Sequence, residues 1–314
     1  MKRLFFLSIL GFVVLACSGL TLPAPSPNVE SATATLGVST PAPTQLNVPA
    51  LTVDQLVNAS YHLEARDDHP TVQLTKGEYQ SATTDPASVD YAVVKIVEPV
   101  ALGDLNGDGL GDGAVLLAEN YGGSGVFVSL IVMLNQGGQP IQVASELIDD
   151  RPIINVLSIQ DGQIFLDATI HGINDPMCCA TFSTRRTYRY QAGHLIMTSF
   201  SSKTPNGSER VISISHPADG DSFLDSWPLT LTGNVTVAPF ENTLGYKIFD
   251  ADNNQVETGS LMVQASQLGG PGSFSLPLDL SRIGTSGPAR VQIEDLSPAD
   301  GSLLALGSVR INIK

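Results

Sequence analysis

Basic residues are scarce in this sequence, and their scarcity argues against a nucleic-acid partner. The 314 residues include 16 Lys and Arg against 31 Asp and Glu, which gives a formal net charge of −15. A surface of this sign is repelled by a phosphate backbone and by an anionic membrane surface. We therefore expect no nucleic-acid partner, whereas cations are compatible ligands.

Sequence motifs of catalysis are absent as well. The five His residues are scattered, and the chain has no H-E-x-x-H, no G-x-S-x-G and no phosphate-binding loop. Each of these motifs brings a nucleophile, a base or metal ligands together on one turn or one helix. Their absence predicts a protein that is not an enzyme. A hydrolase built on paired carboxylates is kept as a third hypothesis, behind the two given below.

The residues that are present have the composition of a turn-rich globular protein. Hydrophobic residues make up 42% of the chain, only 15% is charged, and there are 29 Gly and 20 Pro. This composition is too apolar for a disordered polyelectrolyte. The length suffices for two ordinary domains after a targeting segment is set aside.

The first residues have the organisation of an export signal. Two basic residues precede an apolar run over 4–15, which is too short for a membrane span but suits a signal peptide over 1–16. The run ends in Val14-Leu15-Ala16-Cys17, which resembles the lipobox of bacterial lipoproteins. In that family the Cys thiol is joined to a diacylglycerol, and cleavage before the Cys frees its amine for further acylation.

The lipobox resemblance implies that Cys17 carries a lipid anchor. Two or three acyl chains on one residue hold a protein firmly at a bilayer. An ordinary secretory signal with an incidental Cys17 is the alternative. Residues 17–50 are rich in Pro, Ser and Thr with hardly a charge, which predicts an extended stalk between the membrane and a folded domain.

Residues 51–200 predict a first domain of short strands with one short helix. The helix is expected to begin after Thr52, whose side chain suits an N-cap. Apolar and β-branched segments then recur between hairpin-type turns at 135–138 and 160–162. An alternating segment is expected at 71–79, with a turn at Lys76-Gly77. Strands are expected at 91–100, 114–119, 126–134, 141–147, 153–159, 163–170 and 184–190. The pattern predicts an antiparallel β-rich domain, of α+β type if the helix packs on the sheet.

The most specific chemical pattern is the loop from Asp104 to Asp112, which fits D-x-N-x-D-G-x-x-D. Calcium loops place oxygen ligands at the first, third and fifth positions of a tight turn and a carbonyl at the seventh. The predicted calcium ligands are Asp104, Asn106, Asp108, the Leu110 carbonyl and Asp112. The twelfth position is Val115 in place of the EF-hand Glu, so the expected dissociation constant is on the order of 10⁻⁴–10⁻³ M. A metal-free turn rich in Asn, Asp and Gly is the alternative.

The adjacent pair Cys178-Cys179, shortly after His171, is a second pattern. In an oxidising compartment, adjacent cysteines favour a vicinal disulfide that fixes a loop. Free thiols, and a soft-metal or redox site formed with His171, are the two alternatives left open. Together with the Asp104 loop, this segment resembles a group of bacterial envelope lipoproteins, and the resemblance implies a location without naming an activity.

Residues 209–314 show the strand rhythm of a seven-stranded immunoglobulin-like sandwich. Strands are expected at 211–215, 229–235, 243–250, 255–263, 272–278, 289–295 and 303–313. The segments Ile214–Gly220, Leu231–Leu244 and Gly272–Phe274 resemble the Gmad2 family, an immunoglobulin-like domain found beside GerMN domains in spore-germination and other envelope proteins. The resemblance implies an antiparallel sandwich with an interaction or spacer role. The GerMN pattern itself is absent from residues 51–200.

These patterns together predict a mainly β protein of the cell envelope, lipid-anchored and extracytoplasmic, with calcium as its cofactor. We expect a non-catalytic binding module whose partner is an envelope protein or a cell-wall glycan. A structural spacer in an envelope complex is the second hypothesis. Neither hypothesis specifies which ligand or which face of the membrane is involved.

Overall fold

The described part of the chain is almost entirely antiparallel β-structure, so the predicted fold class is confirmed. The computed structural model describes residues 48–66, 68–283 and 286–314. The expected signal peptide, Cys17 and nearly all of the expected stalk lie outside the described residues. Within the described ranges, no helix is long and apolar enough to cross a membrane.

The chain enters its first sheet through a short helix, α1 (Val53–Val57). The helix begins at the expected N-cap, because Thr52 Oγ1 accepts a hydrogen bond from Gln55 N and the Gln55 side chain accepts one from Thr52 N. Strands β1 (Ser60–His62) and β2 (Thr71–Gln73) form a small hairpin after it. Buried side chains of the helix and hairpin cover one face of the sheet that follows.

Five strands form that first large sheet, in the order β3-β4-β5-β6-β7. They are β3 (Glu78–Gln80), β4 (Val93–Gly103), β5 (Asp112–Asn120), β6 (Phe127–Gln136) and β7 (Gln139–Asp150). Alternate residues of β5 point to opposite faces of the sheet. Val115 and Leu117 pack in the core between this sheet and the helix with its hairpin. Ala114 and Leu116 pack in the core between this sheet and the second sheet. Because both faces are covered, residues 113–118 of β5 form a continuous apolar run without polar alternation.

The second sheet packs on the other face of the first and is built from four strands in sequence order. They are β8 (Ile153–Gln160), β9 (Gln163–Ile170), β10 (Phe182–Gln191) and β11 (His194–Lys203). Two-residue turns with positive φ at both positions, Asp161-Gly162 and Ala192-Gly193, close the hairpins. Strand β11 was not expected, because Ala-Gly is a weak turn signal and the strand lacks an alternating apolar pattern.

The C-terminal region forms the predicted sandwich, and every expected strand is present. They are β13 (Ile212–His216), β15 (Pro228–Val235), β16 (Thr243–Phe249), β17 (Gln255–Ala265), β18 (Gly272–Asp279), β19 (Gly287–Leu296) and β20 (Leu303–Ile313). One layer has the order β13-β15-β18-β17 and the other β17-β16-β19-β20, so that β17 pairs in both. Two short strands, β12 (Glu209–Arg210) and β14 (Asp221–Phe223), were not expected and pair with β11 and β20.

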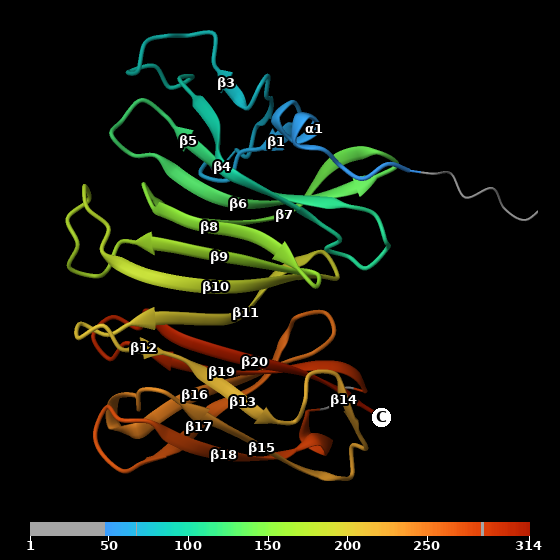
Figure 1. Ribbon diagram of the computed structural model, residues 1–314, viewed down its shortest axis with the longest axis vertical. Helices are drawn as coiled ribbons and strands as arrows, with labels where there is room; N and C mark the ends of the chain where they lie inside the picture. The colour runs from blue at the N-terminus through green and yellow to red at the C-terminus, as the bar shows by residue number, and fades with distance from the viewer. Residues whose placement is uncertain (1–47, 67, 284–285) are drawn as a thin grey trace, which may run out of the picture. The chain divides into compact units, whose positions relative to one another are not determined.

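Strand β11 of the second sheet and strand β20 of the sandwich lie side by side (Figure 1). Their paired positions are Ser199↔Gly307 and Phe200↔Leu306. Glycine is required at position 307, because a Cβ there would lie 2.6 Å from the Ile212 carbonyl oxygen. Through this junction the two expected domains become parts of one compact unit with a continuous run of paired strands.

Candidate functional site

The loop between β4 and β5 is a tight turn whose polar side chains bond to its own backbone. Asp104 accepts hydrogen bonds from Gly107 N at 2.7 Å and from Gly109 N at 2.9 Å. Both glycines have positive φ, 81° and 83°, a conformation that other residues adopt only at a cost. Asn106 Oδ1 accepts from Asp108 N at 2.9 Å, and its amide donates to Asp108 Oδ2. The turn therefore brings together Asp104, Asn106 and Asp108, three of the predicted calcium ligands.

The other two predicted ligands, Leu110 and Asp112, have different surroundings. Leu110 N donates to Asp108 Oδ1 at 2.8 Å, so Leu110 still belongs to the turn. Asp112 opens β5 and is fully buried, and its two carboxylate oxygens accept from Leu105 N and Asn135 N, both at 2.8 Å. Burial raises the pKa of Asp112, and the two backbone N–H groups act in the opposite direction. This carboxylate ties the loop to strand β6.

The donor set of the turn suits calcium in its chemistry, since carboxylate and amide oxygens are the ligands that this cation prefers. However, no group of three or more His, Cys, Asp or Glu side chains in the described ranges is arranged to hold a metal ion. Asp112 in particular is fully buried, whereas Asp104 is half-buried and Asn106 and Asp108 are exposed. Calcium binding stays a prediction, and Asp104, Asn106 and Asp108 are the side chains that would hold the ion.

A polar cleft of about 720 Å³ opens beside this turn. Its walls are the start of the turn at 103–107, the β8–β9 turn at 161–162, the end of β10 at 189–192, and Arg310 on β20. Three of these segments precede the sandwich in the sequence, and the fourth is the last strand of the sandwich. The cleft thus lies where the most specific sequence motif meets the C-terminal region.

Two arginines face one carboxylate at this cleft. Arg310 donates to Asp219 through its backbone N at 2.9 Å, through Nε at 3.1 Å and through Nη2 at 2.6 Å. Arg189 Nη2 lies 3.8 Å from Asp219 Oδ2, beyond hydrogen-bond distance. The side-chain hydrogen bonds from Arg310 hold the pKa of Asp219 below its ordinary value. Asp219 is therefore an ionised partner of Arg310, which leaves Arg189 as the second cation.

Sequence patterns do not point to Arg189, Asp219 or Arg310 as site residues. Asp219 and Arg310 are 91 positions apart, and only the pairing of β11 with β20 brings Arg310 close to β10. Asp219 stands in the segment Ile214–Gly220 that resembles Gmad2, and this is the local signal that could have marked it. Nothing in the sequence of β10 distinguishes Arg189 from its neighbours.

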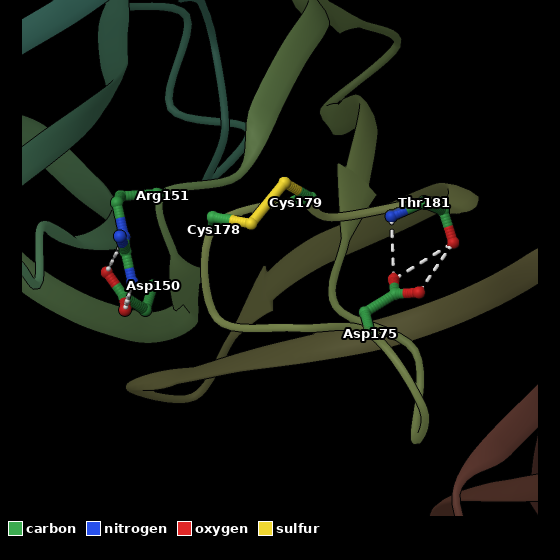
Figure 2. The surroundings of a disulfide bond; sticks show 6 residues. All are labelled: Asp150, Arg151, Asp175, Cys178, Cys179 and Thr181. Atoms are coloured by element: carbon green, nitrogen blue, oxygen red, sulfur yellow. Dashed lines mark hydrogen bonds and ion pairs between the residues drawn. A yellow bond between two sulfur atoms is a disulfide. The ribbon is translucent and has the colours of Figure 1, made fainter.

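Cys178 and Cys179 are joined by a disulfide in the loop between β9 and β10 (Figure 2). Asp175 closes the base of this loop, where it accepts hydrogen bonds from Gly172 N at 2.8 Å and from Thr181 N at 2.7 Å. Both cysteines are exposed at the surface. The sulfur atoms, bonded to each other, are not thiolate ligands in this structure.

Charged residues flank the disulfide loop. Arg151 pairs with Asp150 at 2.7 Å beside Cys178 (Figure 2). His171 Nδ1 lies 2.8 Å from Asp149 Oδ2, and this contact raises the pKa of His171. The imidazole is therefore held by a carboxylate of β7, an arrangement that fixes the start of the loop. This loop does not line the polar cleft.

The C-terminal region matches a known domain family. Residues 211–302 match Gmad2, the immunoglobulin-like domain of bacterial spore germination. These residues form a Gmad2 domain. The resemblance predicted from the sequence is confirmed for this region, and a Gmad2 domain indicates an extracytoplasmic location. Asp219, which binds Arg310 at the cleft, is part of the Gmad2 domain.

Other comparisons add little. No curated protein matches the sequence. One similar solved structure is described as a structural insight into host cell surface retention of a 1.5-MDa bacterial ice-binding adhesin. It shares 13% sequence identity over 71% of this chain and 91% of that chain, with a TM-score of 0.21. A TM-score this low carries no inference about fold or function.

Proposed function

We propose that the protein is a lipid-anchored lipoprotein of the cell envelope that acts as a non-catalytic binding module, with the polar cleft as its binding site. The signal-like segment 1–16 and the lipobox Cys17 support the anchor. The Gmad2 domain supports the extracytoplasmic location. A stalk over 17–50 then separates the folded part from the membrane surface, which would otherwise repel its acidic surface.

The observation that carries the binding role is the construction of the cleft. Its walls are turns and strand ends that the two sheets and the sandwich hold in place, so the cleft exists before a ligand arrives. Its volume of about 720 Å³ lies within the range of roughly 300–1,000 Å³ typical of small-molecule sites. The predicted calcium turn forms one rim, which gives the strongest motif of the sequence a place in the same site.

Two charged groups of the cleft, Asp104 and Arg310, favour binding over catalysis. Asp104 has both carboxylate oxygens occupied by N–H groups of its own turn, and Arg310 is held by Asp219. A general base or nucleophile needs a free atom within reach of the substrate. Fixed partners of this kind orient polar groups toward a ligand without making them reactive.

A structural spacer is the second candidate, and the junction between β11 and β20 favours it. The run of paired strands from β8–β11 through β20 into the sandwich would hold the second sheet and the sandwich at a fixed distance. A spacer needs this junction but does not need an open cleft. A substitution that fills the cleft should therefore abolish the function of a binding module and leave that of a spacer unchanged.

The test compares two bulky substitutions in full-length protein that also carries Cys17→Ser, so that acyl chains cannot account for binding to the envelope. Gln191→Trp places an indole among the cleft walls, and Gln255→Trp places one on an exposed strand end away from them. We expect Gln191→Trp to reduce co-sedimentation with intact cell envelopes from a deletion strain by about tenfold, equivalent to ~1.4 kcal/mol of binding free energy. Gln255→Trp should bind like the wild type. Full binding by both variants would favour the spacer.

A further inference from the structure

We infer that the cleft binds an acidic saccharide, and that Arg189 pairs with the carboxylate or phosphate group of this ligand. The inference rests on the proposed binding role and deepens it by naming the ligand class. The fold holds Arg189 beside a second arginine, Arg310, and among the described residues no carboxylate is hydrogen-bonded to Arg189.

The Arg189 guanidinium has hydrogen-bond donors to offer. The carboxylate oxygen that it faces, Asp219 Oδ2, already accepts from Arg310 Nη2 at 2.6 Å and lies 3.8 Å from Arg189 Nη2. Arg185, on the same strand, instead has Asp167 at 3.2 Å and Glu209 at 3.0 Å. A guanidinium presents five N–H groups in a planar fork that fits a carboxylate or a phosphate. Arg189 is the cleft arginine with this fork available.

The charges around Asp219 do not balance. Arg189 and Arg310 bring two cations to one carboxylate, and their side chains are only 25% and 40% exposed. Solvent therefore screens the repulsion between the two guanidinium groups incompletely. The pKa of Arg189 is lowered, first by burial and then by the nearby Arg310. A second anion at Arg189 would offset both effects.

The other walls of the cleft suit hydroxyl groups. Asn106, Asp161, Tyr190 and Gln191 line it with amide, carboxylate and phenol groups, which donate to or accept from sugar hydroxyls. Asp104 also lines the cleft, and both of its carboxylate oxygens accept hydrogen bonds from N–H groups of its own turn. A ligand with one anionic group and several hydroxyls therefore meets a partner on each wall.

The net charge of the protein limits the length of the ligand. With a formal net charge of −15, the surface repels an extended polyanion. A single acidic sugar, or a short acidic segment of a mostly neutral glycan, meets Arg189 without bringing many charges close to the acidic surface. The acidic surface therefore favours a short acidic saccharide over a nucleic acid or a densely charged polymer.

Calorimetric titration of the detergent-solubilised full-length protein tests the inference with three probes. Maltotriose with its terminal sugar oxidised to a glucuronate carries one carboxylate, maltose 6′-phosphate carries a phosphate, and maltotriose is neutral. We expect at least one acidic probe to bind at least about tenfold more tightly than maltotriose, and the better probe identifies the anionic group. Arg189→Gln should weaken that binding by about tenfold or more, as expected for a lost charged hydrogen bond.

Arg185→Gln is the matched control, because it removes the same side chain from the same strand outside the cleft. It should bind the acidic probe as the wild type does. Arg189→Lys keeps the charge without the fork and should show an intermediate affinity, which decides the matter if Arg189→Gln unfolds. Failure of both acidic probes to bind, equal binding of maltotriose, or wild-type affinity in the Arg189 variants would overturn the inference.

Envelope co-sedimentation separates this inference from the proposed function. If Gln191→Trp loses envelope binding and Arg189→Gln keeps it, the cleft binds a ligand without this arginine, and the acidic saccharide is overturned while the binding module stands. If Arg189→Gln and Gln191→Trp both lose binding, both claims are supported. If Gln191→Trp keeps full binding, the cleft is not the binding site and the proposed function is wrong.

Discussion

At the scale of single residues, Asp295 illustrates how burial sets the ionisation of one carboxyl. Its side chain is buried on β19, and Arg210 Nε lies 3.9 Å from its Oδ2. Burial raises the pKa of Asp295 to about 6, and Arg210 opposes the shift. In the unfolded chain the same group titrates near its ordinary value of about 4. At a pH between these two pKa values, Asp295 is protonated in the folded state and ionised in the unfolded state.

We predict that Asp295 lowers the free energy of unfolding by about 2–3 kcal/mol as the pH rises from about 4 to above 6. The stabilising proton is fully bound below the unfolded pKa and is lost as the pH passes the folded pKa. Asp295→Asn removes this titration, so the stability of the variant relative to the wild type should increase over the same range. Urea unfolding at several pH values measures the difference, and a difference independent of pH would contradict this account of Asp295.

At the scale of elements, the turn between β4 and β5 is predicted to bind calcium through Asp104, Asn106 and Asp108. With a dissociation constant on the order of 10⁻³ M, ~10 mM calcium should stabilise the native state by roughly 1.4 kcal/mol, a few degrees in melting temperature. Asp108→Ala should abolish this calcium-dependent shift. If Asp108→Ala and the wild type respond equally to calcium, the loop is a turn without a metal.

Asp112→Asn is the control that distinguishes calcium binding by the turn from hydrogen bonding at the start of β5. The substitution replaces one of two buried acceptors with a donor that faces a backbone N–H. It should lower the free energy of unfolding by about 1–3 kcal/mol, with calcium or with a chelator present. A loss of stability that appears only in calcium would instead assign Asp112 to the metal.

The sandwich is predicted to fold without the rest of the chain, because its core is closed by residues of its own two layers. Residues 209–314 expressed alone should show cooperative thermal unfolding and the circular dichroism of strands. The exposed edge of β20 that remains is short, since β11 pairs with it at two positions. A disordered product would mean that β11 is required for the fold of the sandwich.

Local sequence signals predicted the elements well where the turn chemistry was strong. The Thr52 cap, the Asp161-Gly162 turn and the seven strands of the sandwich all follow from residues close together in the chain. Strand β11 was missed because Ala192-Gly193 is a weak turn signal. The polar cleft was also missed, because it depends on the pairing of β11 with β20, a long-range contact that no local pattern encodes.

At the scale of the whole molecule, the proposed lipid anchor would keep the cleft close to the membrane. We predict that Cys17 is lipidated, so a palmitate analogue fed to the producing bacterium should label the wild type and not Cys17→Ser. The unlabelled variant should also leave the membrane fraction, because the acyl chains on Cys17 are the proposed anchor. A labelled Cys17→Ser protein would show that the lipid sits elsewhere.

The central claim is that the cleft between the calcium-type turn and the arginine pair is the binding site. Hydrogen–deuterium exchange of the full-length protein, with and without soluble glycan fragments released from the cell envelope, tests it most directly. We predict slower exchange in peptides that cover 103–107, 161–162 and 189–192, and unchanged exchange in β17. Protection confined to other segments, or no protection at any fragment concentration, would contradict the claim.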